Sequence, residues 1–393
     1  MTVLLPELNP SISLAEIGEF SGVLNKMMGD LRLKMLAPKP RKNAPSFNTG
    51  QVCQLCNIDR GRLNYLASKE GATLPPGVIQ ANGRNRKFTL AETREWINAE
   101  AKIAPRPQGT PGEIIICANF KGGSTKTTTA MSLAQGLTLR GRRVLVVDLD
   151  PQASLTELAG IYAERDVDEG QTVMPLIYKE EPDLRYAVQK TYWDGLSVIP
   201  AAPALFSAEF VIPSYLNADP KFRFWDIIGN GLKPLRNEFD YIVIDTAPSL
   251  SYLTINALMS ANAMIMPLVP ESLDFVSSVH FWNLYSDLAK TFAGMDPNKR
   301  FDFISVLLSK VDYSQSSSAP VVRSWVQRAY PNWILPIEIP ASSAASSEAL
   351  EASTIYDINS WEGSNRTLLR IKEPLDALCK LVDDRFVAKC SHQ

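Results

Sequence analysis

Residues 114–130 read IIICANFKGGSTKTTTA, and they contain the most specific motif in the chain. The apolar run at its start predicts a buried β-strand, a glycine-bearing loop follows, and the residues after Lys126 and Thr127 predict a helix. Glycines allow backbone N–H groups to curl around phosphate oxygens, and the positive end of the helix dipole adds to the attraction. The order strand, loop, Lys-Thr and helix is therefore typical of a phosphate-binding loop.

The composition is that of a globular protein in a reducing compartment. The chain has 393 residues, of which 45% are hydrophobic and 21% are charged, and its net charge is −2. This length allows two or three domains, and the small net charge means that nucleic acid would have to be bound by local basic patches. Five cysteines, no secretory signal and no apolar run of about 18 residues indicate a cytoplasmic protein without a membrane span.

Residues 1–45 predict an N-terminal amphipathic helix, with apolar side chains at near-helical spacing over 12–36. The apolar stripe is too long for such a short segment to bury alone. A dimerisation helix is one interpretation of it. The alternative is a helix that packs back on its own chain.

Residues 46–101 predict a winged helix-turn-helix domain. A first helix is expected to start at an N-cap of Thr49, a second to span 60–68, a basic wing to span 83–88, and a third helix to open at Thr89. The stretch resembles the winged helix-turn-helix of MerR-type regulators. The candidate DNA-binding residues on the second helix and the wing are Arg60, Arg62, Asn64, Tyr65, Arg84, Arg86 and Lys87. The alternative is a small helical domain with a solvated charged face.

Cys53 and Cys56 form a C-x-x-C pair, which makes zinc binding an alternative for this domain. A structural zinc ion needs four ligands, and no second Cys or His pair follows at a plausible distance. The two sulfurs are therefore expected to fill apolar space in the first helix.

A Pro- and Gly-rich linker at 102–112 precedes residues 113–393, where apolar strands alternate with helices. Continuous Val, Ile and Leu runs between helices predict an α/β fold with a mostly parallel, doubly wound sheet, as in P-loop NTPases. Strands are expected at 114–118, 142–148, 196–201, 239–245, 263–268, 303–308 and 333–335. Such sheets bind ligands beyond the carboxyl ends of their strands, which is where the motifs fall.

Three strand ends carry the candidate chemistry. At the first, Lys126 would neutralise the β- and γ-phosphates and Thr127 would ligate Mg²⁺. The second, VVDLDPQ, supplies Asp150, which would position the attacking water beside the metal. The third, YIVIDTAP, ends in Asp245, which would hold Mg²⁺ through a water. The candidate magnesium residues are thus Thr127, Asp245 and Asp150; the alternative for each aspartate is a strand-end carboxylate that caps a helix.

The segments KGGSTKTTTA, VLVVDLDPQAS and YIVIDTAPSL resemble the signature segments of the ParA/MinD group of deviant-Walker ATPases. With the winged helix-turn-helix in front, residues 47–97 and 113–380 resemble the larger subclass of ParA-type plasmid or chromosome partition ATPases. The resemblance implies that Lys121 reaches the phosphates bound by a partner subunit. The expected catalytic residues are therefore Asp150, Lys121 and Lys126.

The same resemblance places adenine near Asp312 and near two late segments that would close over it, Glu338–Pro340 and Ser347–Ala349. The expected nucleotide-binding residues are Lys121, Gly122, Gly123, Ser124, Thr125, Lys126, Thr127, Thr128, Asp312 and Pro340. Thr125 stands where most members have glycine, and a positive φ there would cost a β-branched residue about 1–2 kcal/mol. Either the loop has an ordinary conformation at Thr125, or nucleotide affinity is modest.

Non-specific DNA binding in the family uses arginines near the late Ile-Pro segment, but ASSAASS at 341–347 lacks the arginine that many relatives carry. The remaining candidates are Arg323 and Arg328 on the helix before Pro331, and Arg366 and Arg370 near the last helix. Of these, Arg328 is expected on the DNA-binding face. The alternative is a plain solvated charge.

The resemblance implies a cytoplasmic, nucleoid-associated ATPase that uses ATP, ADP and Mg²⁺ and is slow unless stimulated. ATP would drive homodimer formation and non-specific DNA binding, a ParB-like centromere-binding partner would stimulate hydrolysis, and the N-terminal domain would bind the operator for autorepression. The alternative is a nucleotide-responsive transcriptional regulator without a partition role.

Two other readings of the ATPase motifs are disfavoured. A MinD-like membrane protein would need a basic amphipathic C-terminal helix, and Pro374, Asp383 and Asp384 argue against one. A reductase like the nitrogenase iron protein would need paired cysteines for its cluster, but only Cys379 and Cys390 follow Cys117. We therefore expect no membrane contact and no iron–sulfur cluster.

Overall fold

The computed structural model describes residues 12–36, 42–68, 73–80, 85–314, 319–341, 353–358 and 365–391. The chain forms two compact units, which divide between Lys42 and Asn43. The first unit contains α1 (Leu14–Leu36), which is the N-terminal helix expected from the sequence. Large apolar side chains of α1, among them Ile17, Phe20 and Leu24, are exposed.

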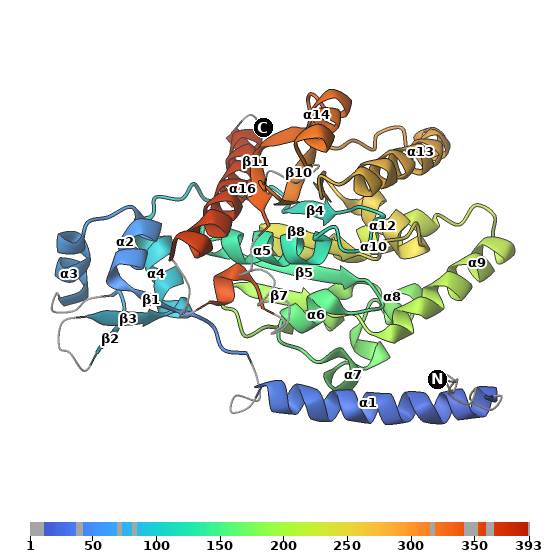
Figure 1. The fold of residues 1–393 in the computed structure, drawn as a ribbon, viewed down its shortest axis with the longest axis horizontal. Coiled ribbons are helices and arrows are strands. Elements are labelled where there is room, and N and C mark those ends of the chain that lie inside the picture. The colour runs from blue at the N-terminus through green and yellow to red at the C-terminus, as the bar shows by residue number, and fades with distance from the viewer. Residues whose placement is uncertain are drawn as a thin grey trace, which may run out of the picture. The chain divides into compact units, whose positions relative to one another are not determined.

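The described part of the second unit is built around an eight-stranded sheet in the order β11-β10-β9-β4-β8-β5-β7-β6 (Figure 1). Its parallel strands are β4 (Glu113–Cys117), β5 (Val144–Leu149), β7 (Leu196–Ile199), β8 (Tyr241–Thr246), β9 (Ala263–Leu268), β10 (Phe303–Val311) and β11 (Ile334–Pro340). The two-residue strand β6 (Gln189–Lys190) pairs antiparallel with β7 at one edge, and the sequence did not predict it. The predicted mostly parallel α/β sheet is confirmed.

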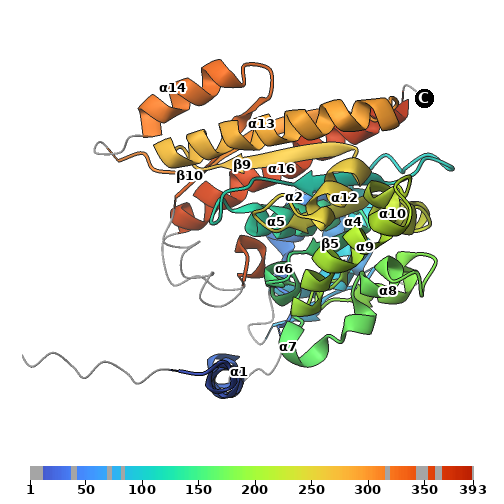
Figure 2. The same ribbon diagram turned by 90° about the vertical axis from the view of Figure 1, so that its right-hand side faces the viewer.

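Helices cover both faces of this sheet (Figures 1 and 2). Alternate side chains of each central strand point to opposite sides, so Ile115 and Val146 enter one apolar core while Ile116 and Val147 enter the other. The first core is closed mainly by α5 (Lys126–Thr138), α6 (Ser154–Leu158), η5 (Ile355–Asp357) and α16 (Asn365–Ser391). The second is closed mainly by α8 (Met174–Ile177), α9 (Ala208–Ala218), α10 (Ile227–Leu232), α12 (Tyr252–Ser260), α13 (Ser272–Met295) and α14 (Ala319–Ala329).

Short helical turns complete the loops between these elements. They are α7 (Ala163–Asp166), η1 (Glu169–Gln171), η2 (Leu184–Ala187), η3 (Pro203–Ser207), η4 (Phe224–Asp226) and α11 (Leu235–Glu238). Within the described residues, no helix is both long and apolar enough to cross a membrane.

The C-terminal helix α16 is continuous, and Pro374 lies inside it without ending it. Asp383 is 3% exposed. Its buried carboxylate pairs with Arg142 across 2.7 Å and accepts a hydrogen bond from the Tyr241 hydroxyl at 3.0 Å. This buried pair attaches α16 to β8 and to the turn before β5.

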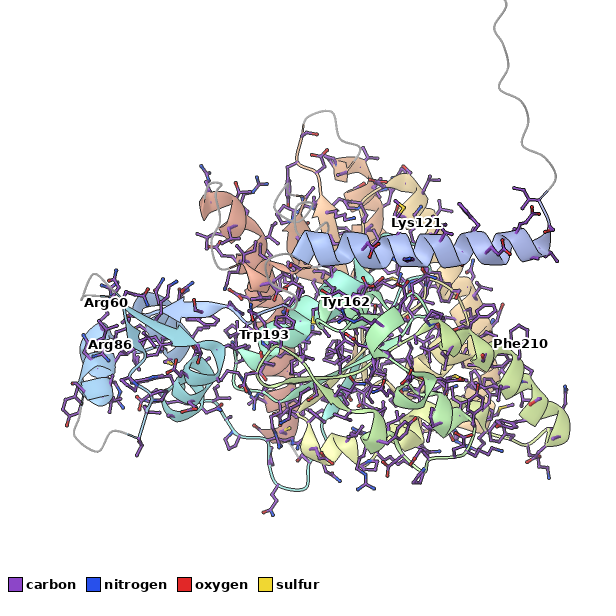
Figure 3. All side chains as sticks on the ribbon, turned by 90° about the horizontal axis from the view of Figure 1, so that it is seen from below. Arg60, Arg86, Lys121, Tyr162, Trp193 and Phe210 are labelled. Atoms are coloured by element: carbon purple, nitrogen blue, oxygen red, sulfur yellow. The ribbon has the colours of Figure 1, made fainter. Side chains whose placement is uncertain are left out.

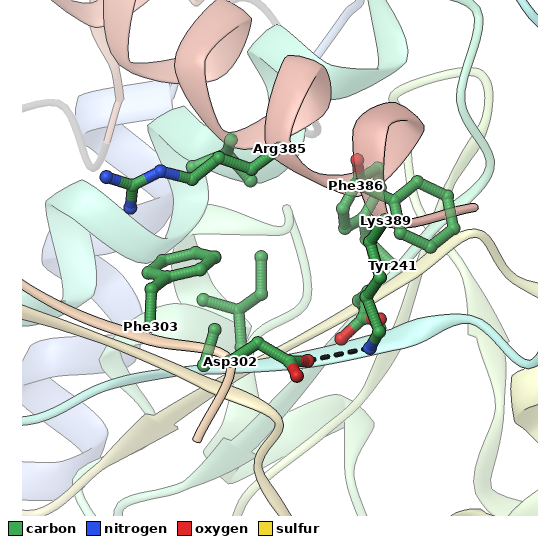
Figure 4. Close-up of a pocket in the computed structure, with 10 residues that line it drawn as sticks. Tyr241, Asp302, Phe303, Arg385, Phe386 and Lys389 are labelled. Carbon is green, nitrogen blue, oxygen red and sulfur yellow. Dashed lines mark hydrogen bonds and ion pairs between the residues drawn. The ribbon is translucent and has the colours of Figure 1, made fainter. Parts of the chain in front are cut away.

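A cavity of about 450 Å³ lies beneath the last turns of α16, at the amino ends of the central strands (Figure 4). Lys389 bridges Glu113 and Asp302 there, and its Nζ lies 2.7 Å from an Asp302 carboxylate oxygen. The motifs lie at the opposite, carboxyl edge of the sheet. This cavity is therefore separate from the phosphate-binding loop.

The start of the second unit holds α2 (Thr49–Cys56), α3 (Arg60–Ser68) and α4 (Leu90–Glu100) beside an antiparallel sheet of β1 (Ser46–Asn48), β3 (Arg86–Thr89) and β2 (Val78–Ile79). The expected N-cap of Thr49 is wrong. Asn48 caps α2, because its side chain accepts from the Gln51 N–H while the Gln51 side chain accepts from the Asn48 N–H. The capping box of Thr89 and Glu92 on α4 is confirmed.

Cys53 and Cys56 are both buried in the core under α2, where they pack with Val52 and Leu63. Burial raises the pKa of the Cys56 thiol to about 12. The two thiols thus serve as small apolar side chains of this core.

Arg94 of α4 ties this N-terminal part to the large sheet. Its guanidinium is buried and donates to the carbonyls of Thr138 at 3.2 Å and Arg142 at 3.0 Å, and it pairs with Asp194 at 2.6 Å. Gly195, at φ +79°, lies against the guanidinium, since an added Cβ would fall 2.1 Å from the Arg94 Cζ. Residues 46–101 and the sheet therefore share one continuous core.

We expect Arg94→Ala to lower the free energy of unfolding by about 2–4 kcal/mol, because two buried carbonyls lose their donors. Urea denaturation followed by circular dichroism measures this change. The matched control is Glu95→Ala, an exposed neighbour on the same helix, which should unfold like the wild type. Equal unfolding midpoints for Arg94→Ala and Glu95→Ala would contradict the anchoring role of Arg94.

Candidate functional site

The loop between β4 and α5 curls around the backbone carbonyl of Lys121. The Lys126 ammonium donates to this carbonyl at 3.1 Å, and the Ser124 hydroxyl donates to it at 3.0 Å. Gly123 has a φ of +74°, a conformation that glycine adopts without steric cost. Lys126 is 6% exposed, so its charge faces the inside of the loop. This is the geometry that a phosphate cradle requires.

Thr125 has a φ of 69° and a ψ of 17°, in the left-handed region. Of the two alternatives for Thr125, an ordinary loop conformation is therefore wrong, and a modest nucleotide affinity stays a prediction. No side-chain hydrogen bond from Thr125 caps α5, and its hydroxyl instead donates to the Ser309 hydroxyl at 2.9 Å. Ser309 was not among the predicted site residues, because the two residues meet only through the pairing of distant strands.

Asp148 and Asp245 lie directly opposite each other on the paired strands β5 and β8, and both are fully buried. Burial and the nearby Asp148 raise the pKa of Asp245 to about 8, and burial raises the pKa of Asp148 to about 7. Burial lowers the pKa of Lys126, and the attraction of Asp245 and Asp150 opposes that shift. An ammonium and three carboxylates thus gather at adjoining strand ends.

The Thr127 hydroxyl donates to Asp245 Oδ2 at 2.6 Å. Asp245 Oδ1 is buried and has no hydrogen-bond partner among the described residues. A hydroxyl beside a buried carboxylate with an unused oxygen is the donor set that suits a partly hydrated Mg²⁺ ion. The predicted pair of Thr127 and Asp245 is therefore brought together.

Asp148 holds the loop that carries Asp150. Its carboxylate accepts from the N–H of Asp150 at 3.1 Å and from both the N–H and the hydroxyl of Thr156, at 2.9 and 2.8 Å. Asp150 itself is half-buried and accepts from the Gln152 N–H at 2.9 Å. The sequence showed that two aspartates end the strand, but only the structure separates their surroundings.

Lys121 points toward α13, where its Nζ lies 3.9 Å from Asp274 Oδ2. Asp274 is 4% exposed, and burial raises the pKa of its carboxyl group while Lys121 opposes that shift. The Lys121 side chain remains 37% exposed. Within one chain, Lys121 therefore stands at the rim of the cradle, while Lys126 occupies its inside.

The predicted adenine contacts lie at the ends of neighbouring strands, since Val311 of β10 pairs with Pro340 of β11. Asp312 is exposed, and hydrogen bonds from the Ser314 N–H and hydroxyl lower its pKa. A hollow of about 400 Å³ beside Asp312 is lined by Val269, Pro270, Glu271, Ser272, Leu273, Lys310 and Ala319. The other late segment that resembles the family, 347–349, lies outside the described residues.

The predicted DNA contacts on α3 are all exposed, and these are Arg60, Arg62, Asn64 and Tyr65. The Arg62 Nε–H donates to a Glu100 carboxylate oxygen at 2.6 Å, so one donor of the Arg62 guanidinium is already engaged within the chain. On β3, Lys87 is exposed and Arg86 donates to the Pro76 carbonyl at 2.7 Å. In Figure 3, Arg60 and Arg86 are seen at the same end of the unit, away from Lys121.

The structure describes only one of the two other arginines expected to contact DNA, Arg84 and Arg328. Arg84 falls outside the described residues. Arg328 is exposed on α14, whereas Arg323 on the same helix pairs with Glu338 at 2.5 Å.

The chain is similar to known proteins in sequence and in fold. Residues 112–293 match the AAA_31 family, described as an AAA domain. The chain is 27% identical over 375 residues to a putative replication protein A of Sinorhizobium fredii, which covers 92% of this chain and 90% of that protein. It is 38% identical over 163 residues to the chromosome partitioning protein ParA of Myxococcus xanthus, which covers 42% of this chain and 54% of ParA.

The solved structure of a partition protein is 18% identical and has the same fold, with a TM-score of 0.63 over 95% of this chain and 99% of that one. The ParA match, the AAA match and this fold agree with the phosphate-binding loop and the two strand-end aspartate motifs. The chain is therefore similar in part of its sequence to a ParA-type partition protein, and it has the fold of a solved partition protein.

Proposed function

We propose that this protein drives DNA segregation through Mg²⁺-dependent ATP hydrolysis in a homodimer. The observation that carries this proposal is the meeting of Lys126, Thr127 and Asp245 at the end of the phosphate-binding loop. The Thr127 hydroxyl donates to one carboxylate oxygen of Asp245, and the other oxygen is buried with no hydrogen-bond partner among the described residues. The name and function of the Myxococcus xanthus relative support a role in partitioning.

The loop residues have separable roles in this proposal. Lys126 and the backbone N–H groups of the loop bind the β- and γ-phosphates, and Thr127 and Asp245 hold the magnesium ion. When bound, the ion would neutralise charge that develops on the phosphate oxygens. Asp150 is free to orient a water toward the γ-phosphate, because its neighbour Asp148 keeps the loop in place.

Lys121 would act on the phosphates held by the second subunit. Its position at the rim of the cradle, with 37% of the side chain exposed, suits a residue that leaves its own chain on dimerisation. Asp274 holds it within one chain, so dimer formation has to break the 3.9 Å contact between them.

DNA and a protein partner complete the proposal. A ParB-like centromere-binding protein would stimulate hydrolysis, and Arg328 is the candidate for non-specific DNA contact. The N-terminal part, with its helix-turn-helix spacing and its exposed α3, would bind an operator, and the exposed apolar side chains of α1 would join two chains. A regulator without a partition role would use the same residues, and a plasmid-loss assay on a deletion strain separates the two functions.

We expect Lys126→Ala to abolish nucleotide binding, because the cradle loses the charge that neutralises the phosphates. Asp150→Ala should bind ATP like the wild type but lose turnover by about 100-fold or more, as expected for loss of a group that assists proton transfer or water positioning. Titration with a fluorescent ATP analogue and a phosphate-release assay measure the two properties. Turnover of Asp150→Ala at the wild-type rate would show that another residue positions the water.

The raised pKa of Asp245 predicts a pH dependence of stability without nucleotide. The folded-state pKa of about 8 exceeds the ordinary value of 3.8, so the contribution of Asp245 to stability is full below the ordinary pKa and is lost as pH rises through 8. Asparagine can still accept from the Thr127 hydroxyl and cannot ionise. The melting temperature of Asp245→Asn should therefore gain on that of the wild type between about pH 5 and about pH 9.

Differential scanning fluorimetry in metal-free buffer measures this gain. The control is Asp219→Asn, an exposed carboxylate, whose melting temperature should follow the wild type across the range. A constant difference in melting temperature between Asp245→Asn and the wild type at every pH would show that the pKa of Asp245 is not raised.

Operator binding is tested by gel shift with the DNA upstream of the gene. Arg60→Ala should weaken the complex by about 1–3 kcal/mol, since a base-edge contact of this type has that magnitude. The control Lys190→Ala removes an exposed charge from the distant edge strand β6 and should leave the shift unchanged. Equal shifts for Arg60→Ala and Lys190→Ala would mean that α3 does not enter a groove.

A further inference from the structure

Thr125 and Ser309 join the phosphate-binding loop to the end of β10. Thr125 Oγ1 donates to Ser309 Oγ at 2.9 Å, and Ser309 is only 1% exposed. Thr125 immediately precedes Lys126, the first residue of α5, while β10 leads directly into Asp312. The contact therefore connects the phosphate side and the base side of the proposed ATP site.

The backbone at Thr125 needs an external support. Its φ of 69° lies in a region that β-branched residues disfavour and that glycine enters freely. Such outliers persist where surrounding contacts fix them, and they gather at functional sites. The Thr125 hydroxyl faces Ser309, with the Thr129 hydroxyl further away at 3.4 Å.

A β-bulge lies in β10 where this strand approaches the phosphate-binding loop. The register between β10 and β11 shifts between Leu308 and Val311, and Lys310 within this shift has a φ of 49°. Bulges redirect side chains and are common next to active sites. Lys310 Nζ lies 3.4 Å from the Gly123 carbonyl, so both bulge residues, Ser309 and Lys310, reach the same loop.

We infer that Ser309 is a positioning residue for nucleotide binding, which fixes Thr125 and so holds the phosphate cradle curled before the nucleotide arrives. This inference rests on the proposed ATP site. A glycine at position 125 would adopt this φ without steric cost. Threonine does not, so the hydrogen bond to Ser309 is needed to hold the conformation. Because the cradle surrounds the β-phosphate, which ADP and ATP share, the effect of Ser309 should be equal for the two nucleotides.

The test is a double-mutant cycle on the full chain, with N-methylanthraniloyl-ADP and Mg²⁺ as the fluorescent probe. Ser309→Ala should weaken probe binding by about three- to tenfold, the range of one net hydrogen bond. Thr125→Val keeps the shape of the side chain without its hydroxyl and should cause a similar loss. The double variant should be no weaker than either single one within about twofold, because both remove the same contact.

Three further measurements separate positioning from a general structural effect. Thr125→Ser keeps the hydroxyl and should restore most of the probe binding that Thr125→Val loses. Ser305→Ala removes another buried hydroxyl of β10, one that contacts Arg385, and should also leave probe binding unchanged. For Ser309→Ala, turnover at saturating ATP should stay within about twofold while the KM for ATP rises, as for a contact made equally in ground and transition states.

The outcomes distinguish the inference from the function on which it rests. A wild type that fails to bind the probe overturns the proposed ATP site itself. A wild type that binds, together with Ser309→Ala that binds equally well, overturns the positioning role alone. Losses that multiply in the double variant also overturn it, because Ser309 would then act without Thr125. If Ser309→Ala fails to fold, Thr125→Val against Thr125→Ser decides the question.

Discussion

A buried ammonium among buried carboxylates is the constraint on which the site depends. Lys126 and Asp245 could not be charged alone in this interior, since an isolated ion out of water costs several kcal/mol even after the protein relaxes. They stabilise each other because β4 lies beside β8, and β8 lies beside β5. That strand order brings the start of α5 and the aspartates of two further strands to one edge of the sheet. Every proposed role at the site follows from this juxtaposition.

The site is unfavourable for folding and suited to binding. Burial raises the pKa of Asp148 and Asp245, so both carboxyl groups resist ionisation. Thr125 has a backbone conformation that is unfavourable for a β-branched residue. A bound cation and phosphates would supply the charges that the empty cradle lacks, and ligands that bind only the folded state stabilise it. Strain and unpaired polar atoms gathered at one strand edge are therefore the mark of a ligand site in this fold.

Much of this could be read from the sequence, because local signals decide it. The expected parallel strands and the phosphate-binding loop appear where apolar runs and glycines place them, and the capping box of Thr89 and Glu92 is intact. The two-residue strand β6 has no apolar run to reveal it. Pro374 lies inside α16, where tertiary packing on the sheet overrides the low helix propensity of proline.

The contacts that the sequence could not show are those between distant segments. Asp274 beside Lys121, Ser309 beside Thr125, and Arg94 beneath Thr138 each join residues that meet only after the sheet is assembled. A pattern within one segment carries no signal for such a meeting. For the same reason the sequence does not distinguish the role of Asp148 from that of Asp150. Two aspartates one residue apart look alike in sequence, and only their hydrogen bonds in the structure differ.

If two chains complete each other's ATP site, mixing two inactive variants should restore ATP hydrolysis. Lys121→Ala and Asp150→Ala should each be inactive alone. If Lys121 acts on the partner's phosphates, a mixed dimer contains one complete site, formed by the Asp150 of one chain and the Lys121 of the other. Equal mixing should then restore about a quarter of the wild-type rate of phosphate release, since random pairing makes half of the dimers mixed. No recovery, with mixed dimers shown to form, would contradict the shared site.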